Sequence, residues 1–238
     1  MRTLERPRID TMAPEHLETA LFALGCFQDM EARLGFTRGV WRTCTGYAGG
    51  VFSSPRYEET GDHIEAVRVQ YAPREVSYGQ LLELFTGWYR MAPLDAASRH
   101  SAVIFVRTEK ERRLARAAVE RSTLCRFDAG AVPPAPPGSG NESPALSARP
   151  AVRVLPFKIF IPAEKPWQKY YLHAASWLYE ELLELYGDED ALLSSTLAAR
   201  LNGFLRHPSQ SALHCLPESV DLYGLSPYDR QTLRAMAI

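Results

Sequence analysis

The chain has 238 residues, of which 46% are hydrophobic, and this suffices for one full-sized domain with an extension or for two small domains. Its 27 basic and 28 acidic residues nearly balance, so we expect small or neutral substrates and no nucleic acid partner. No apolar run approaches the roughly 18 residues of a membrane span, and residues 1–6 lack the apolar core of a secretory signal, so we expect a soluble, cytoplasmic protein without a membrane partner.

Cys26 lies where an apolar segment passes into a predicted helix. Residues 20–24 are apolar, Gly25-Cys26-Phe27 follows, and residues 28–34 are predicted to be helical. A cysteine in the first turn of a helix meets unpaired backbone N–H groups and the positive end of the helix dipole, which stabilise a thiolate. Cys26 is therefore either a nucleophile or a small buried residue at a strand-to-helix corner.

The following segments alternate between strand and helix patterns. Strands are predicted at 40–48, 64–71 and 101–106 from β-forming, alternating or continuous apolar residues. One helix is predicted to begin after an N-cap at Ser77, and another after a capping box at Thr108. Two β-α-β units in this order predict an α+β fold, a two-layer ferredoxin-like (split βαβ) sandwich with helices on one face of a mostly antiparallel sheet.

The rest of the chain divides into an insertion, an edge strand and a helical extension. Residues 128–150 contain six prolines and three glycines, a composition typical of a disordered insertion. Residues 152–161 are predicted to form an edge strand, because an internal proline cannot donate a ladder hydrogen bond. Helical patterns follow, so we expect one catalytic domain over residues 1–172 and a C-terminal helical and loop extension over 173–238.

The cysteines exclude two kinds of site. The four of them, at positions 26, 44, 125 and 215, are too few and too widely spaced for a disulfide scaffold. The six histidines do not cluster with them at metal-ligand spacing, so we expect no metal. The spacing of the cysteines still allows individual cysteines to act as reactive thiols.

Five short motifs follow one another along the chain. They are G-C-F at 25–27, G-Y-A-G-G at 46–50, P-R-Y at 55–57, H-I-E-A-V at 63–67, and A-E at 163–164 followed by Q-K-Y at 168–170. Over residues 18–172 their order and spacing resemble the peptide methionine sulfoxide reductase A family. The resemblance implies an α+β two-layer sandwich and an enzyme that reduces the S-epimer of methionine sulfoxide, peptide-bound or free, to methionine.

The resemblance implies a role for each motif residue. Cys26 attacks the sulfoxide sulfur and becomes a sulfenic acid, and Glu65, a carboxyl shielded from full solvation, supplies a proton as general acid. Tyr57 donates a hydrogen bond to the sulfoxide oxygen, Phe27 forms a wall of the cage for the substrate methyl group, and His63 joins the substrate-binding set by orienting its loop. The family needs no metal or organic cofactor, and an external thiol reductant such as thioredoxin regenerates the cysteine.

The chain departs from the family at the substrate pocket. Gln28 stands where the family usually carries a tryptophan, which should weaken methyl recognition by about 1–3 kcal/mol. Asp95 lies near a family aspartate that supports substrate binding, and Arg99 takes the place of a second family tyrosine. The missing indole would have to come from another segment, at Trp41, Trp88 or Trp167.

Two cysteines are candidates for resolving the sulfenic acid. Cys215, in a predicted loop-like tail, is the preferred resolving thiol, and Cys44, on a predicted strand, is second. If neither reaches Cys26, the external thiol reduces the sulfenic acid directly. Rival interpretations are a reductase for a different small sulfoxide, or a catalytically weakened relative that acts as a redox sensor or interaction module and docks through helices within 172–205.

Overall fold

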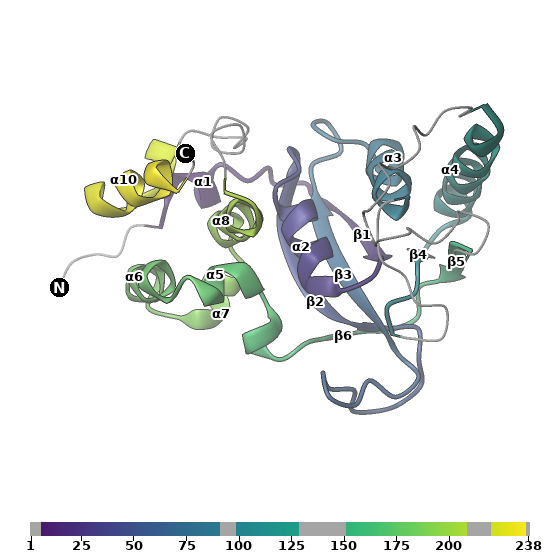
Figure 1. Cartoon of the computed structure of the whole chain (residues 1–238), viewed down its shortest axis with the longest axis horizontal. Coiled ribbons are helices and arrows are strands. Elements are labelled where there is room, and N and C mark those ends of the chain that lie inside the picture. Colours follow the sequence, from purple (N-terminus) through teal and green to yellow (C-terminus); the bar gives the residue numbers. More distant parts are fainter. Residues whose placement is uncertain (1–5, 91–98, 129–150, 209–219, 237–238) are drawn as a thin grey trace, which may run out of the picture.

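The computed structural model describes residues 6–90, 99–128, 151–208 and 220–236, with the backbone alone at 123–128. Most of the 128–150 insertion, Asp95 and Cys215 therefore lie outside the described residues. The described chain is a mixed α/β structure built on one six-stranded sheet with the strand order β5-β4-β1-β3-β2-β6 (Figure 1).

The sheet has four inner strands, β4, β1, β3 and β2, and two short edge strands, β5 and β6. The central strand β1 pairs antiparallel with both β3 and β4, β2 pairs antiparallel with β3 and β6, and β5 lies parallel to β4. The strands predicted at 40–48 and 64–71 are confirmed. The bounds are β1 Glu18–Ala23, β2 Val40–Ala48, β3 Ile64–Tyr71, β4 Val103–Val106, β5 Arg153–Pro156 and β6 Phe160–Pro162.

The single strand predicted at 152–161 is wrong, because this segment forms two strands on opposite edges of the sheet. β5 ends at Pro156, which lacks the N–H needed to continue a ladder, and β6 begins at Phe160. The four residue steps between them span at most about 14 Å. The sheet must therefore curl until its two edges approach each other.

Helices α2 (Phe27–Gly35), α3 (Tyr78–Tyr89) and α4 (Glu109–Asp128) pack on one face of this sheet. The predicted caps are present: the Ser77 hydroxyl accepts a hydrogen bond from the Gln80 N–H, and the Thr108 hydroxyl accepts one from the Glu111 N–H. The core between sheet and helices holds large buried side chains from all these elements, among them Phe22, Leu34, Val67, Leu81 and Phe85.

The C-terminal helices form a second apolar cluster beside the first. Ile9 of the short helix α1 (Arg8–Thr11) is fully buried in this cluster, so both ends of the described chain meet there. In Figure 1 these helices gather on one side of the sheet, with α8 next to α2. They are α5 Tyr170–Ala174, α6 Ser176–Tyr186, α7 Glu189–Leu193, α8 Thr196–Arg206, η3 Val220–Tyr223 and α10 Pro227–Ala235. The short helix η2 (Lys165–Trp167) precedes them, and its Trp167 packs against the first cluster.

Close packing holds α8 against α2. A Cβ atom added at Gly35 would lie 2.5 Å from the carbonyl oxygen of Ala199, and one added at Gly203 would lie 2.7 Å from that of Ala32. Only glycine at these two positions lets the helix backbones approach so closely. The C-terminal helices therefore fix the position of α2, the helix that begins directly after Cys26.

Side chains of the C-terminal segment also cover the part of the β2 edge that β6 does not pair with. The side-chain amide of Gln168 bonds both the N–H (2.9 Å) and the carbonyl (2.8 Å) of Thr45, as a neighbouring strand would. Arg200, fully buried, donates to the carbonyl of Val40 at 2.6 Å. Polar side chains thus satisfy the backbone groups that an edge strand would otherwise leave open.

Lys169 and Glu31 join the same segment to α2 by a buried ion pair. The Lys169 Nζ lies 2.6 Å from Glu31 Oε1 and donates to the carbonyl of Thr43 at 2.9 Å, and neither charged side chain is exposed. Lys169 has a φ of 51°, in the left-handed region that non-glycine residues rarely adopt. The contacts to Glu31 hold this strained backbone in place.

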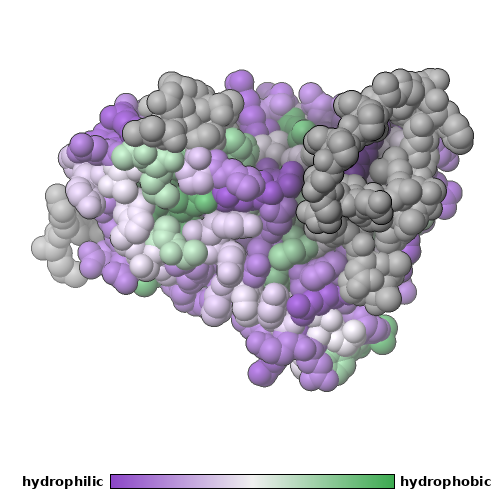
Figure 2. Space-filling model, viewed as in Figure 1, coloured by the Kyte–Doolittle hydropathy of each residue, from purple (hydrophilic) through white to green (hydrophobic). Residues whose placement is uncertain are grey.

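Hydrophobic residues on the face seen in Figure 2 form small patches, several over the side of the C-terminal helices, separated by polar residues. Trp177 and Leu183 of α6 are each just over one-third exposed, whereas Leu178 and Leu182 of the same helix are fully buried. The leucine pattern of α6 is therefore largely that of ordinary packing.

Candidate active site

Cys26 is the N-cap residue of α2 and is half-buried. Gly25 before it has a φ of 64°, a left-handed conformation that turns the chain from β1 into the helix. Burial raises the pKa of the Cys26 thiol, and the N–H groups of Asp29 and Gln28 only partly oppose this. The helix N–H groups thus favour the thiolate, as the sequence indicates, but desolvation outweighs them in the free site and the net pKa is raised.

Gln28 lies against the sulfur of Cys26. The Cys26 Sγ is 3.6 Å from the Gln28 Oε1, within reach of a weak S–H···O hydrogen bond. An amide carries an acceptor and a donor on the same group, so it suits either the thiol or, after rotation, the thiolate. The residue that replaces the family tryptophan thus contacts the candidate nucleophile directly.

Glu65 of β3 lies fully buried beside Cys26. Its Oε2 accepts a hydrogen bond at 3.0 Å from the backbone N–H of Phe27, the residue after the cysteine. Its Oε1 lies 3.0 Å from Arg99 Nε and 3.4 Å from His100 Nε2. The carboxylate therefore joins the start of α2 to two basic side chains that follow residues 91–98 in the chain.

Three aromatic rings from distant segments stack beside this cluster. The ring of Tyr57 lies 5.9 Å from that of Phe27 on one side and 3.8 Å from that of Trp167 on the other. The guanidinium carbon of Arg99 is 4.6 Å from the Tyr57 ring centroid, and Arg99 also donates a hydrogen bond to the Tyr57 carbonyl. Phe27 is buried beneath this stack, so Tyr57 and Trp167 present the more accessible ring faces.

Trp167 is the tryptophan that reaches the site. The indole of Trp41 instead donates to Glu75, and that of Trp88 lies beneath the Arg33 guanidinium. The sequence could name Trp167 as one of three alternatives but could not choose among them, since the choice depends on where η2 packs.

Glu164 is a site residue for which the sequence analysis assigned no role. Its carboxylate accepts hydrogen bonds from the Tyr47 hydroxyl at 2.8 Å and the Tyr57 N–H at 3.2 Å. Burial raises its pKa, but the backbone N–H groups and the Tyr47 hydroxyl outweigh burial, and the net pKa is lowered. Glu164 therefore holds the Tyr57 loop as an anion. The only sequence signal for it was its place in the motif at 163–164.

The remaining candidates lie elsewhere or outside the described residues. The Nε2 of His63 lies 2.9 Å from the Phe52 carbonyl, so this histidine holds its own loop together. Cys44 lines a cavity between β2 and α7 that Cys26 does not line, and both cysteines are free thiols. Asp95 and Cys215 lie in segments that the structure leaves undescribed. Within the described ranges, no group of three His, Cys, Asp or Glu side chains is placed to hold a metal ion.

Comparison with known proteins identifies the family. The profile described as peptide methionine sulfoxide reductase matches residues 18–132. Peptide methionine sulfoxide reductase A5 of Oryza sativa subsp. japonica is 36% identical over 199 residues, which cover 79% of this chain and 67% of the rice protein. The chain belongs to the peptide methionine sulfoxide reductase A family. As a member of this family it is an oxidoreductase.

Two further relatives extend the comparison. The A5 reductase of Arabidopsis thaliana is 32% identical over 195 residues, covering 79% of this chain and 68% of its own. That share exceeds residues 1–132, so likeness to reductase A5 proteins continues into the C-terminal part. The solved methionine sulfoxide reductase A of Corynebacterium diphtheriae, 24% identical, shares the fold, with a TM-score of 0.54 over 74% of this chain and 81% of that one.

Of the helices within the described ranges, none combines the length and the apolar character that crossing a bilayer requires.

Proposed function

We propose that this reductase converts methionine S-sulfoxide, peptide-bound or free, to methionine through a sulfenic acid on Cys26. The observation that carries the proposal is the 3.0 Å hydrogen bond between the Glu65 carboxylate and the N–H of Phe27, because it supports a nucleophile and a proton-transfer group in one site. Because the pKa of the Cys26 thiol is raised, the thiol needs a base to remove its proton, and the carboxylate beside it can accept that proton and later donate it.

The proposed step moves one oxygen atom and is balanced in protons. Glu65 takes the proton of the Cys26 thiol, and the sulfur then attacks the sulfoxide sulfur. The oxygen then passes to Cys26 as the S–O bond of the substrate and the transient S–S bond both break, and Glu65 returns the proton to it. The products are methionine and Cys26 sulfenic acid, so cysteine sulfur is oxidised and substrate sulfur is reduced.

Arg99 is proposed as the second donor to the sulfoxide oxygen, together with the Tyr57 hydroxyl. It pairs with Glu65 and lies over the ring of Tyr57, which supports a position between the acid and the phenol. A guanidinium stabilises developing negative charge on oxygen more strongly than a neutral phenol does. Where the family resemblance implies two neutral donors, this chain combines one phenol with one cation.

Trp167 is proposed as the wall of the methyl cage that Gln28 does not supply. Its ring stacks on Tyr57 at 3.8 Å, and Tyr57 in turn stacks on Phe27. The contact between Gln28 and the Cys26 sulfur supports a separate task for the amide, which would donate to the thiolate once the proton has left. His63, which orients its loop, and Asp95, which lies near a family aspartate that supports substrate binding, remain in the proposed substrate-binding set.

Cys215 is proposed as the resolving thiol, and a thioredoxin-like external thiol as the source of electrons. Arg206 at the end of α8 bonds Asp29 in the first turn of α2, so the chain leaves α8 close to the helix end that carries Cys26. Seven residue steps separate residues 208 and 215, a reach of about 25 Å. The Cys215 thiol would displace water from the sulfenic acid to form a disulfide, which the reductant then opens by thiol exchange.

The finer architecture is proposed as well. The order β4-β1-β3-β2, with α2 after β1 and α3 after β3, supports a ferredoxin-like split βαβ unit within the sheet. We assign catalysis to residues 1–172. The packing of α8 on α2 supports a role for residues 173–238 in holding that unit together.

Turnover of resolved sulfoxide epimers with dithiothreitol tests the proposal. We expect reduction of the S-epimer, abolished in Cys26→Ser and slowed at least about a hundredfold in Glu65→Gln, the loss typical of a general acid. Cys44→Ser serves as the matched control and should keep its activity. Absence of turnover with every methyl sulfoxide would refute the proposal and favour the redox-sensor alternative.

A further inference from the structure

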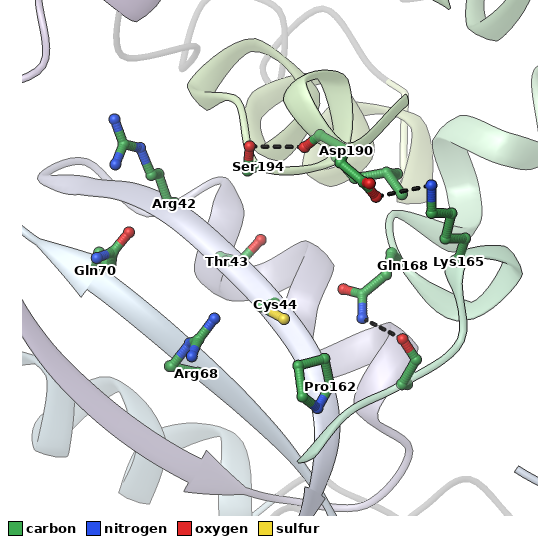
Figure 3. A pocket seen from close by; sticks show the side chains of 12 residues that line it. Arg42, Thr43, Cys44, Arg68, Gln70, Pro162, Lys165, Gln168, Asp190 and Ser194 are labelled. Carbon is green, nitrogen blue, oxygen red and sulfur yellow. Dashed lines mark hydrogen bonds and ion pairs between the residues drawn. The ribbon is translucent and has the colours of Figure 1, made fainter. Parts of the chain in front are cut away.

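A cavity of about 210 Å³ lies between the sheet and the C-terminal helices, outside the proposed active site. Its walls come from β2 and β3 on one side and from α7 and the segment around η2 on the other (Figure 3). None of Cys26, Tyr57 and Glu65 lines it. It is smaller than the roughly 300–1,000 Å³ cavities that hold drug-sized ligands, so its occupant would be a molecule of a few carbon atoms.

The sheet side of the cavity presents two exposed arginines, Arg42 and Arg68, and the half-buried Gln70. Arg42 lies opposite Gln70, and Arg68 lies opposite Cys44, in the register of β2 and β3, so these side chains share one face of the sheet. In the described parts of the chain, no hydrogen bond or ion pair involves the side chains of Arg42, Arg68 or Gln70. Arg68 instead stacks on the Phe160 ring, at 5.0 Å.

The opposite side of the cavity is already satisfied. Lys165 lies 2.8 Å from Asp190 and 3.1 Å from Glu189, so this side carries one net negative charge. The side-chain amide of Gln168 donates to the carbonyls of Thr45 and Ala163, and Ser194 donates to the carbonyl of Asp190. Together with Arg42 and Arg68, the charged groups around the cavity therefore leave one net positive charge, on the sheet side.

Cys44 does not oppose a bound anion. Burial raises the pKa of its thiol, although Lys169 and Arg68 work in the other direction, so the sulfur is neutral near pH 7. Figure 3 shows the Arg68 guanidinium on the Cys44 side, and Arg42 at the rim beyond Thr43 with its guanidinium turned away from Arg68. Because both arginines lie on the same face of the sheet, a bound anion would be attracted by both charges once the Arg42 side chain turns inward.

We propose that this cavity binds a small organic oxyanion, a short-chain carboxylate or phosphate, whose charged group pairs with Arg68 and Arg42. Gln70 donates a further hydrogen bond, and Pro162 and Leu193 give the carbon chain an apolar wall. Guanidinium groups bind carboxylate and phosphate with two parallel hydrogen bonds, which fits either chemistry. The site is separate from sulfoxide reduction and does not depend on it.

Calorimetric titration of the full chain at low salt tests this site, with succinate and inorganic phosphate as the two probes. We expect saturable binding of at least one probe, and the stronger of the two identifies the oxyanion. Arg68→Gln and Arg42→Gln should each weaken binding about tenfold or more, the usual loss for a charge-assisted hydrogen bond. Arg74→Gln, an exposed arginine that does not line the cavity, should bind as the wild type does.

Alkylation of Cys44, followed by peptide mass spectrometry, locates the bound probe. The probe should slow N-ethylmaleimide labelling at Cys44 while leaving labelling at Cys26 unchanged. The proposal is overturned if neither probe binds, if binding survives both arginine substitutions, or if bound probe leaves the Cys44 labelling rate unaltered. Sulfoxide turnover does not enter these readouts, so failure here and failure of the proposed function are distinguishable.

Discussion

Replacing Arg99 by glutamine tests the most unusual part of the proposed mechanism, a cation at the sulfoxide oxygen. Arg99 lies 3.0 Å from Glu65, and its side chain is 29% exposed. A hydrogen bond from a charged group contributes about 1.5–3 kcal/mol, and partial exposure screens this charge toward the lower end. About 1.5–2 kcal/mol corresponds to a fall in kcat/KM of roughly 10- to 30-fold.

The assay is steady-state reduction of the S-epimer with dithiothreitol, in which kcat and KM are measured separately. If Arg99 acts on charge that develops in the transition state, kcat falls and KM stays nearly constant. Arg99→Lys keeps the charge but loses the planar fork and should give an intermediate rate. Arg99→Tyr, which introduces a second phenol as in the family, should lose less activity than Arg99→Gln.

Controls separate this role from a merely structural one. Arg116→Gln changes an exposed arginine of α4 and should leave both constants unchanged. Because Arg99→Gln removes the cation from a buried carboxylate, its melting temperature must be measured beside the activity. If folded Arg99→Gln keeps kcat/KM within about twofold of the wild type, the reasoning is wrong.

Three further predictions address the thiol, the aromatic stack and the C-terminal helices. Glu65→Gln removes a negative charge that raises the pKa of Cys26, so the pH dependence of iodoacetamide labelling at Cys26 should move to lower pH, and an unchanged curve would contradict the contact. Trp167→Ala should raise KM about tenfold and Trp167→Phe about threefold or less, while Trp88→Phe, whose indole lies beneath Arg33, should change nothing. Burial and Glu181 raise the pKa of Asp229 to about 7, so its contribution to stability is complete below about pH 4 and is lost as pH rises through 7. The wild-type melting temperature should therefore fall between pH 5 and 8 more than that of Asp229→Asn, and equal slopes would refute the assignment.

The sequence correctly predicted those helices and strands that depend on interactions between residues close together in the chain. The capping box at Ser77 and the alternation at 64–71 involve neighbours within a few residues, and both are found as expected. The prediction of one strand at 152–161 was wrong because the two halves of this segment pair with different strands, β4 and β2. A short apolar run does not indicate which distant strand it will pair with.

For the site, too, the sequence indicated what local motifs determine and missed what distant contacts determine. The motifs gave Cys26, Glu65 and Tyr57, and the structure brings them together with Phe27 and Gln28. The N–H groups at the start of α2, which favour the Cys26 thiolate, could be inferred from the sequence, whereas the depth of burial that raises the thiol pKa could not. Glu164 and Trp167 reach the site across more than 100 residues, a distance over which composition and periodicity carry no information.

The way that Gln168 and Arg200 cover β2 affects how this reductase can be shortened. A fragment ending at residue 172 would keep Gln168 but lose Arg200 and the helix that lies on Gly35. The carbonyl of Val40 and the adjacent strand edge would then be open to pairing with a second chain. Such a fragment should self-associate when expressed. Truncation alone would therefore not give a minimal reductase, and charged residues would also have to be introduced along the exposed edge of β2.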